Sequence, residues 1–165
     1  MAIRMFVTGG TFDKSYNEHT GELYFKDTYL PEMLKLGRCK ADFQFRTLMM
    51  TDCLSMTEED RTIILHNCQK AKEEKIIITH GTDTMVEMAK VLARAKLKKT
   101  IILTGAVVPY TFVSSDGLFN LGNAIAFAQS LPHGLYIAMN GKCFEADQVR
   151  KDKKKGEFVD TSLIP

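Results

Sequence analysis

Short runs of apolar residues, many of them β-branched, recur along the chain and alternate with segments of helical pattern. Each run is only a few residues long, a length typical of a buried strand, whereas the intervening segments carry apolar residues at helical spacing. The pattern predicts strands over residues 3–8, 43–49, 75–79, 100–104 and 134–139, and helices over residues 31–37, 57–73, 85–96 and 116–130.

Two of these helices carry local boundary signals. Thr57 is followed three residues later by Asp60, a spacing that predicts a capping box at a helix start. Pro31 is suited to a first helical turn, and Gly37 is suited to the position just past a helix end. The sequence therefore marks the start of both helices and the end of the first.

Strands that alternate with helices at this spacing predict parallel β-α-β units. The strands are almost continuously apolar, so helices must cover both faces of the sheet. We predict one domain over residues 1–165, folded as a three-layer α/β/α sandwich with a doubly wound, mainly parallel sheet of the flavodoxin or Rossmann type. In such sheets ligands bind beyond the carboxyl ends of the strands, so the loops after the first, third and fourth strands are candidate sites.

The segment between the first strand and the first helix, residues 13–27, is polar and contains Thr20-Gly21 as a turn signal. Its short alternating pieces predict a surface hairpin or a mobile loop. A loop in this position could cover a site at the end of the first strand.

Charge and cysteine content narrow the classes of function. The chain has 22 basic and 20 acidic residues, a net charge of +2, which gives no strong overall field for nucleic acid or an anionic membrane. No apolar run approaches the roughly 18 residues that span a bilayer, and the first apolar stretch is too short for a signal peptide, so we expect a cytoplasmic protein. The 4 cysteines lack a C-x-x-C spacing and are expected to be reduced, buried thiols. A small-molecule partner is favoured.

The one run of basic residues lies near the C-terminus, at residues 150–155. A solvated face is the usual explanation of such a run. Nucleic-acid binding through it is disfavoured, because it is a single cluster without interleaved aromatic residues.

Two loops after strands carry candidate chemistry. Residues 8–11 (TGGT) follow the first strand, and their glycines allow a close backbone approach to a ligand, although a plain turn is the alternative explanation. The loop lacks the further glycine of a dinucleotide site and the lysine of a phosphate-binding loop. Residues 80–85 (HGTDTM) follow the third strand and lead into a helix N-terminus, where free N–H groups favour a carboxylate. Helix capping by Thr82 or Asp83 is the alternative there.

Taken together, TGGTF at residues 8–12 and HGTDTM at residues 80–85 resemble the two signature loops of bacterial-type L-asparaginases. The likeness continues through LTGAVVP, where the family has a Gly-Ala loop that ends in proline, and through SSDGLFNLGNA, which is similar to the family's Ser-Ala-Asp-Gly-Pro-Phe-Asn-Leu segment. The resemblance spans the whole chain in order.

The resemblance implies a catalytic role for residues in both loops. Thr11 would be the nucleophile, and Tyr24 in the polar segment would polarise or deprotonate it, with Tyr16 as the alternative. A hydroxyl needs such help, because it is a weak nucleophile at neutral pH.

A second catalytic group, Thr82, Asp83 and Lys151, follows from the same resemblance, with Lys153 as the alternative lysine. Lys151 could act as a neutral base beside Thr82, or as a charged group paired with Asp83. The sequence leaves both roles open.

The implied reaction is hydrolysis of the asparagine side-chain amide to aspartate and ammonia through an acyl-enzyme ester, without a metal or an organic cofactor. Backbone N–H groups near Thr82 and Ala106 would meet the oxyanion, and Asp83 would hold the α-amino group. The expected substrate-binding residues are Gly10, Asp52, Cys53, Gly81, Asp83 and Ala106.

The chain departs from the family at one part of this pocket. Where family members have a serine and then a glutamine or related polar residue for the α-carboxylate, this chain has Cys53 and Leu54. Val108 also replaces the arginine that usually precedes the loop proline. These changes weaken the expectation that asparagine is the substrate more than they weaken the expected chemistry.

Full-length family members continue into a second domain that completes a neighbouring subunit's site. We therefore expect a homodimer or homotetramer here. The alternative to an amidohydrolase is a non-catalytic or weakly active domain that binds an amino acid or an amide metabolite.

Overall fold

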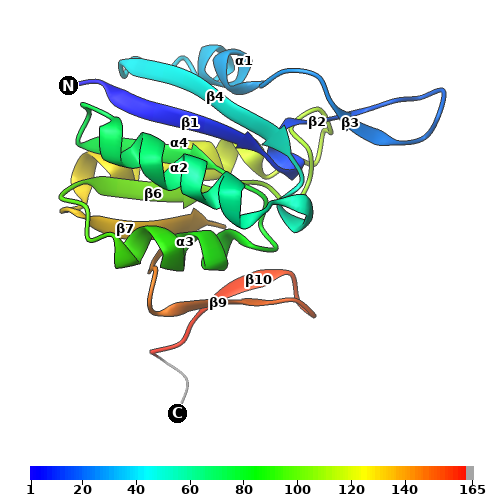
Figure 1. The fold of residues 1–165 in the computed structure, drawn as a ribbon. Helices are drawn as coiled ribbons and strands as arrows, with labels where there is room; N and C mark the ends of the chain where they lie inside the picture. The colour runs from blue at the N-terminus through cyan, green and yellow to red at the C-terminus, as the bar shows by residue number, and fades with distance from the viewer. Residues whose placement is uncertain (163–165) are drawn as a thin grey trace.

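The computed structural model describes residues 1–162 and contains a six-stranded sheet as its central layer (Figure 1). Five strands are parallel, and β8 pairs antiparallel with β7 at one edge. This confirms the predicted mainly parallel sheet. In spatial order the strands are β4 (Phe43–Thr51), β1 (Ile3–Gly9), β5 (Lys75–Thr79), β6 (Thr100–Thr104), β7 (Gly134–Met139) and β8 (Lys142–Glu145).

Helices cover both faces of the sheet, as the continuously apolar strands required (Figure 1). One apolar cluster lies between the sheet and α2 (Glu58–Lys70) and α3 (Met85–Arg94). The other cluster includes side chains of α1 (Leu30–Leu36) and α4 (Gly117–Ser130). The predicted three-layer sandwich is confirmed.

The order of the strands places a switch point between β1 and β5. The chain leaves β1, crosses to β4 on one side, and then returns to β5 on the other side of β1. Loops that leave two adjacent strands in opposite directions open a crevice at the carboxyl ends. This edge is where the predicted site loops lie.

The polar segment after β1 forms a short 3₁₀ turn, Thr11–Asp13, and then a two-stranded hairpin. Its strands, β2 (Lys14–Tyr16) and β3 (Leu23–Phe25), pair antiparallel and project away from the sheet (Figure 1). The predicted surface hairpin is confirmed.

Helix boundaries follow local backbone geometry closely. The Thr57 side chain accepts from Asp60 N at 3.2 Å, and the Asp60 carboxylate accepts from Thr57 N at 2.9 Å, which confirms the capping box. The helix ends at Lys70 rather than at residue 73, because Ala71 is extended with ψ 136°. The next helix stops before Lys96, whose φ of 46° is left-handed.

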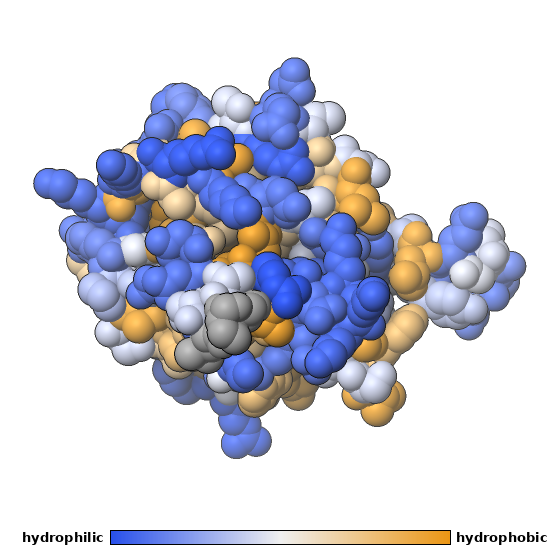
Figure 2. Space-filling model, turned by 90° about the horizontal axis from the view of Figure 1, so that it is seen from below, coloured by the Kyte–Doolittle hydropathy of each residue, from blue (hydrophilic) through white to orange (hydrophobic). Residues whose placement is uncertain are grey.

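The segment after β8 is more ordered than its charge pattern indicates. β9 (Val149–Asp152) and β10 (Glu157–Asp160) form a hairpin against the α3 side of the sheet. Phe158 is buried and lies 6.4 Å from Phe144, centroid to centroid. Figure 2 views the molecule from below Figure 1, and the surface in this view is largely hydrophilic, with apolar residues visible among the polar ones. Alternation of buried and charged residues hid this hairpin in the sequence.

Within residues 1–162, no helix is both long enough and apolar enough to cross a membrane.

Candidate active site

The loops after β1 and β5 touch through two glycines. Gly10 has φ 77° and ψ 179°, a conformation essentially reserved for glycine. A Cβ added at Gly10 would lie 2.5 Å from the backbone nitrogen of Gly81. Gly81 in turn packs against the Cys53 side chain, which comes from the loop after β4. Three loops therefore meet at the switch point, and small residues make their approach possible.

Beside this contact, three predicted catalytic residues form one polar group. The Lys151 ammonium donates to Thr82 Oγ1 at 2.8 Å and to Asp83 Oδ1 at 2.5 Å. The Lys151 side chain is 11% exposed and that of Asp83 is 42% exposed. A cation that holds both a hydroxyl and a carboxylate can orient the hydroxyl and stabilise nearby negative charge.

The β9–β10 hairpin positions this lysine. Lys151 lies opposite the buried Phe158 in the antiparallel pair, so both side chains are on the same face of the hairpin. Lys153, the alternative lysine, is exposed and lies in the turn between the two strands. Of the two lysines, only Lys151 lies within hydrogen-bonding distance of Thr82.

Thr11 begins the 3₁₀ turn directly after Gly10 and is half-buried. Its hydroxyl makes no hydrogen bond to any other residue that the structure describes. It directly follows Gly10, which contacts Gly81 of the loop that carries Thr82. An unbonded hydroxyl at this edge is available to a ligand.

The two tyrosines considered for Thr11 are not bonded to it. Tyr24 is 44% exposed and lies opposite Ser15 on one face of the hairpin. Tyr16 is also exposed, and its ring packs edge-on against Phe112 at 6.2 Å. The structure therefore does not bring either hydroxyl to the threonine.

Asp52 and Cys53 lie beside the glycine contact but offer a ligand few free groups. Asp52 Oδ1 accepts from Leu54 N at 3.0 Å, and Oδ2 pairs with Lys14 Nζ at 2.5 Å. The hydrogen bond from Lys14 lowers the pKa of the Asp52 carboxyl. Cys53 is buried, and the Leu54 side chain is exposed. At the two positions expected to bind the carboxylate, Cys53 and Leu54, the one side-chain donor is the weak thiol of Cys53.

Backbone donors are available in the loops after β5 and β6. Ala106 is buried after β6, and the N–H groups of Ala106 and Thr82 have no acceptor within residues 1–162. The following loop is held by Asp116, whose carboxylate accepts from Val107 N and Val108 N at 3.0 Å. Unpaired N–H groups on a fixed loop are suited to an oxyanion.

His80 has a structural role that its sequence position did not reveal. The ring is fully buried, and Nδ1 lies 2.8 Å from the Gly81 carbonyl oxygen. Burial lowers its pKa to about 4, so the ring is neutral at pH 7 and Nδ1 must donate to that carbonyl. His80 therefore fixes the backbone just before Thr82.

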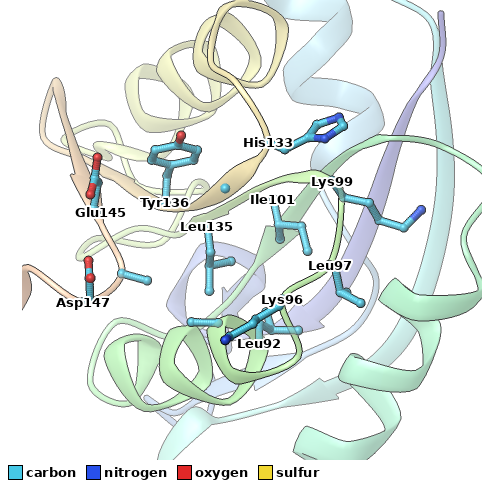
Figure 3. Close-up of a pocket in the computed structure, with 13 residues that line it drawn as sticks. Leu92, Lys96, Leu97, Lys99, Ile101, His133, Leu135, Tyr136, Glu145 and Asp147 are labelled. Carbon is cyan, nitrogen blue, oxygen red and sulfur yellow. The ribbon is translucent and has the colours of Figure 1, made fainter.

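A separate hollow of about 350 Å³ lies at the opposite, amino-terminal edge of β6 and β7. Figure 3 shows Glu145 and Asp147 on one side of it and Lys99 and His133 on the other. The Lys99 ammonium is already bonded to the carbonyls of Ala71 and Glu73. None of the predicted site residues lines this hollow, so it is distinct from the candidate site. Within residues 1–162, no three His, Cys, Asp or Glu side chains are grouped to hold a metal ion.

The sequence matches the family model described as asparaginase, N-terminal, over residues 2–157. It is 40% identical over 163 residues to a probable periplasmic L-asparaginase of Haemophilus influenzae, covering 90% of this chain and 46% of that protein. It is 27% identical to L-asparaginase 1 of Escherichia coli, covering 99% of this chain and 52% of that protein. The chain thus spans about half the length of these curated relatives.

Solved structures agree with this assignment. The thermostable L-asparaginase from Thermococcus kodakarensis superposes with a TM-score of 0.86 at 26% identity, over 97% of this chain and 51% of that chain. A structure described as a probable cytoplasmic L-asparaginase from Campylobacter jejuni gives a TM-score of 0.79 at 27% identity, over 98% and 53% of the two chains. With a family match over residues 2–157 and the same fold, this chain belongs to the asparaginase family and corresponds to its N-terminal domain.

Proposed function

We propose that the protein hydrolyses the side-chain amide of L-asparagine, or of a closely related small amide, to the acid and ammonia. The observation that carries the proposal is the Lys151–Thr82–Asp83 group, beside a loop contact that brings Thr11 to the same edge. Lys151 and Thr82 are 69 positions apart in the sequence, yet the lysine ammonium donates to the threonine hydroxyl. A structural helix cap would not require the lysine.

In the proposed reaction, Thr11 Oγ1 attacks the amide carbon and forms a C–O bond. The negative charge that develops on the amide oxygen is met by the N–H groups of Thr82 and Ala106. Collapse of this intermediate breaks the C–N bond, and the nitrogen takes up the proton that the Thr11 hydroxyl gives up on attack and leaves as ammonia. Water then hydrolyses the Thr11 ester and regenerates the hydroxyl.

Lys151 acts in this proposal as an ammonium ion, because it is held by the Asp83 carboxylate at 2.5 Å. It orients Thr82 and favours the charge that develops beside it. Asp83 is partly exposed, and its second oxygen holds the substrate α-amino group. Tyr24 polarises Thr11 only if the hairpin rearranges toward the site, since its hydroxyl is not bonded to the threonine here.

The test is ammonia release from asparagine and glutamine by the parent, Thr11→Ala, Thr82→Val and Lys151→Met. Each variant is expected to lose about 100-fold or more in kcat/KM, since each removes a group that acts on the reacting atoms or orients one that does. Lys153→Met is the matched control, because that lysine is exposed in the adjacent turn, and it should stay within about twofold of the parent.

The alternative function is a domain that binds an amino acid or an amide metabolite without cleaving it. The altered pocket at Cys53 and Leu54 is the observation that favours it. Aspartate binding by a parent protein that releases no ammonia would support the alternative and sink the enzyme proposal.

We also propose that the chain forms a homodimer or homotetramer and takes a small amide rather than nucleic acid as its partner. Exposed apolar residues on the loops at the carboxyl edge support self-association, namely Leu54, Val107, Phe112 and Val113. Cysteines 39, 53, 68 and 143 are free, which supports a reducing, cytoplasmic location.

A further inference from the structure

Lys14 lies where the hairpin joins the site. It follows the 3₁₀ turn that carries Thr11 and is the first residue of β2. Its side chain is 17% exposed, and its ammonium pairs with Asp52 at 2.5 Å. The Phe25 ring lies 5.8 Å from the same ammonium. The charge is therefore held in place at the rim of the site.

Asp52 connects this charge to the glycine contact. One oxygen of Asp52 caps the 3₁₀ turn Cys53–Ser55, and the other oxygen holds Lys14. Cys53, the next residue, packs against Gly81, which directly precedes Thr82. The ion pair thus bridges the loops after β1 and β4, on the side of the crevice next to Thr82.

Lys14 is the cation of these loops that has the most N–H donors left for a ligand, because Asp52 takes one of its three whereas Thr82 and Asp83 take two from Lys151. Across residues 8–14, 51–55 and 80–84, Lys14 is the one lysine or arginine, and His80 is buried and neutral. The Lys151 ammonium is already shared by Thr82 and Asp83. Cys53 and Leu54 supply a buried thiol and an exposed apolar side chain. A substrate carboxylate at this rim has one positive partner.

We propose that Lys14 is the residue that binds the carboxylate of the substrate, so that the site selects amides that carry a carboxylate at their other end. An ammonium has three N–H donors, and Asp52 takes one of them, so Lys14 can bind a carboxylate while it keeps Asp52. Asp83 then holds the amino group on the other side. This inference rests on the proposed amidohydrolase function.

Three amides separate the contributions of the substrate's charges. Asparagine carries both a carboxylate and an amine, succinamic acid carries only the carboxylate, and 3-aminopropanamide carries only the amine. For Lys14→Met, the KM for the first two is expected to rise about tenfold or more, because a charge-assisted hydrogen bond is lost. The KM for 3-aminopropanamide should stay within about twofold.

Two further variants separate binding from folding. Lys14→Arg retains the charge and should restore most of the discrimination, whereas Lys26→Met, an exposed lysine of the same segment, should leave all three KM values unchanged. An equal loss on all three amides in Lys14→Met would overturn the proposal, because the ion pair would then serve only to hold the hairpin.

A binding assay tests the role of Lys14 even if the protein has no amidohydrolase activity. If the parent releases no ammonia from any amide, calorimetry with L-aspartate and β-alanine replaces the kinetic assay, since β-alanine lacks the α-carboxylate. Lys14→Met should then weaken aspartate about tenfold or more and leave β-alanine unchanged. If the parent binds neither ligand, or if both weaken equally, the proposal fails.

Discussion

At the scale of single residues, the site depends on two glycines, whose lack of a side chain lets the loops approach closely, as well as on the polar residues that these loops carry. Gly10 and Gly81 let two loops touch, and this contact brings the threonine after Gly10 toward the loop that carries Thr82. The glycine pair after the first strand has little meaning in the sequence, because such pairs are common in turns. Its importance appears only when the second loop lies against it.

This contact predicts a large difference between two glycines with similar φ. Gly10→Ala places a methyl group 2.5 Å from backbone, so it should lower the free energy of unfolding by more than about 3 kcal/mol and abolish ammonia release. Gly21 has φ 72°, and its nearest atom is 4.0 Å away, so Gly21→Ala should cost only about 1–2 kcal/mol. Urea unfolding measures both, and equal losses would contradict the contact.

At the scale of elements, the β2–β3 hairpin is tied down at its base by a buried carboxyl group. Asp13 Oδ1 accepts from Tyr29 N at 2.9 Å and from the Thr28 hydroxyl at 3.0 Å, which joins the two ends of the segment. The other oxygen is buried without a partner in the described chain. Burial raises the pKa of Asp13 from 3.8 to about 6, and Asp27 adds to the rise.

The raised pKa predicts how the stability of the fold depends on pH. Asp13 binds a proton more tightly in the folded chain, so its contribution to stability is full below about pH 4 and is lost as pH rises through about 6. Asp13→Asn removes this dependence. Relative to the parent, its free energy of unfolding should therefore increase by about 2 kcal/mol between pH 4 and pH 7.

Urea unfolding at several pH values checks this prediction. Asp42→Asn, which removes an exposed carboxyl just before β4, is the matched control for the loss of one carboxylate and is unfolded under the same conditions. A constant difference between Asp13→Asn and the parent over this range would show that Asp13 keeps an ordinary pKa.

At the scale of the whole molecule, the carboxyl edge of the sheet combines chemistry with exposed apolar surface. The loops after β4 and β6 present Leu54, Val107 and Val113 to solvent next to the candidate site. Large apolar side chains gathered at one edge often mark an interaction surface. The proposed homo-oligomer would cover this edge and close the crevice.

Light scattering tests this assembly directly. We expect a mass of about two or four times the 18.6 kDa of one chain, and Leu54→Lys with Val113→Asp should lower it toward one chain. Ile63→Lys changes an exposed isoleucine in the middle of α2, outside these loops, and should leave the mass unchanged. A single-chain mass for the parent at all concentrations would contradict the proposal.

Most of the fold could be predicted because its signals are local. The apolar runs of β1, β5, β6 and β7 mark buried strands by themselves, and Thr57 with Asp60 marks a helix start. The β9–β10 hairpin was missed, because its few buried residues, such as Phe158, alternate with lysines and acids. Those side chains are buried only by packing against α3 and β8, which no local pattern reports.

The features of the candidate site also fall into those that the sequence predicts and those that only the folded structure shows. The sequence by itself determined the family, the layered fold and the identity of Thr11, Thr82 and Asp83 as candidates, because strand ends and motif residues are contiguous in the chain. Only the tertiary structure decided that Lys151 reaches Thr82, that Tyr24 is not bonded to Thr11, and that Lys14 pairs with Asp52. The physical reason is that charge pairs form across long sequence separations and depend on where folded loops meet.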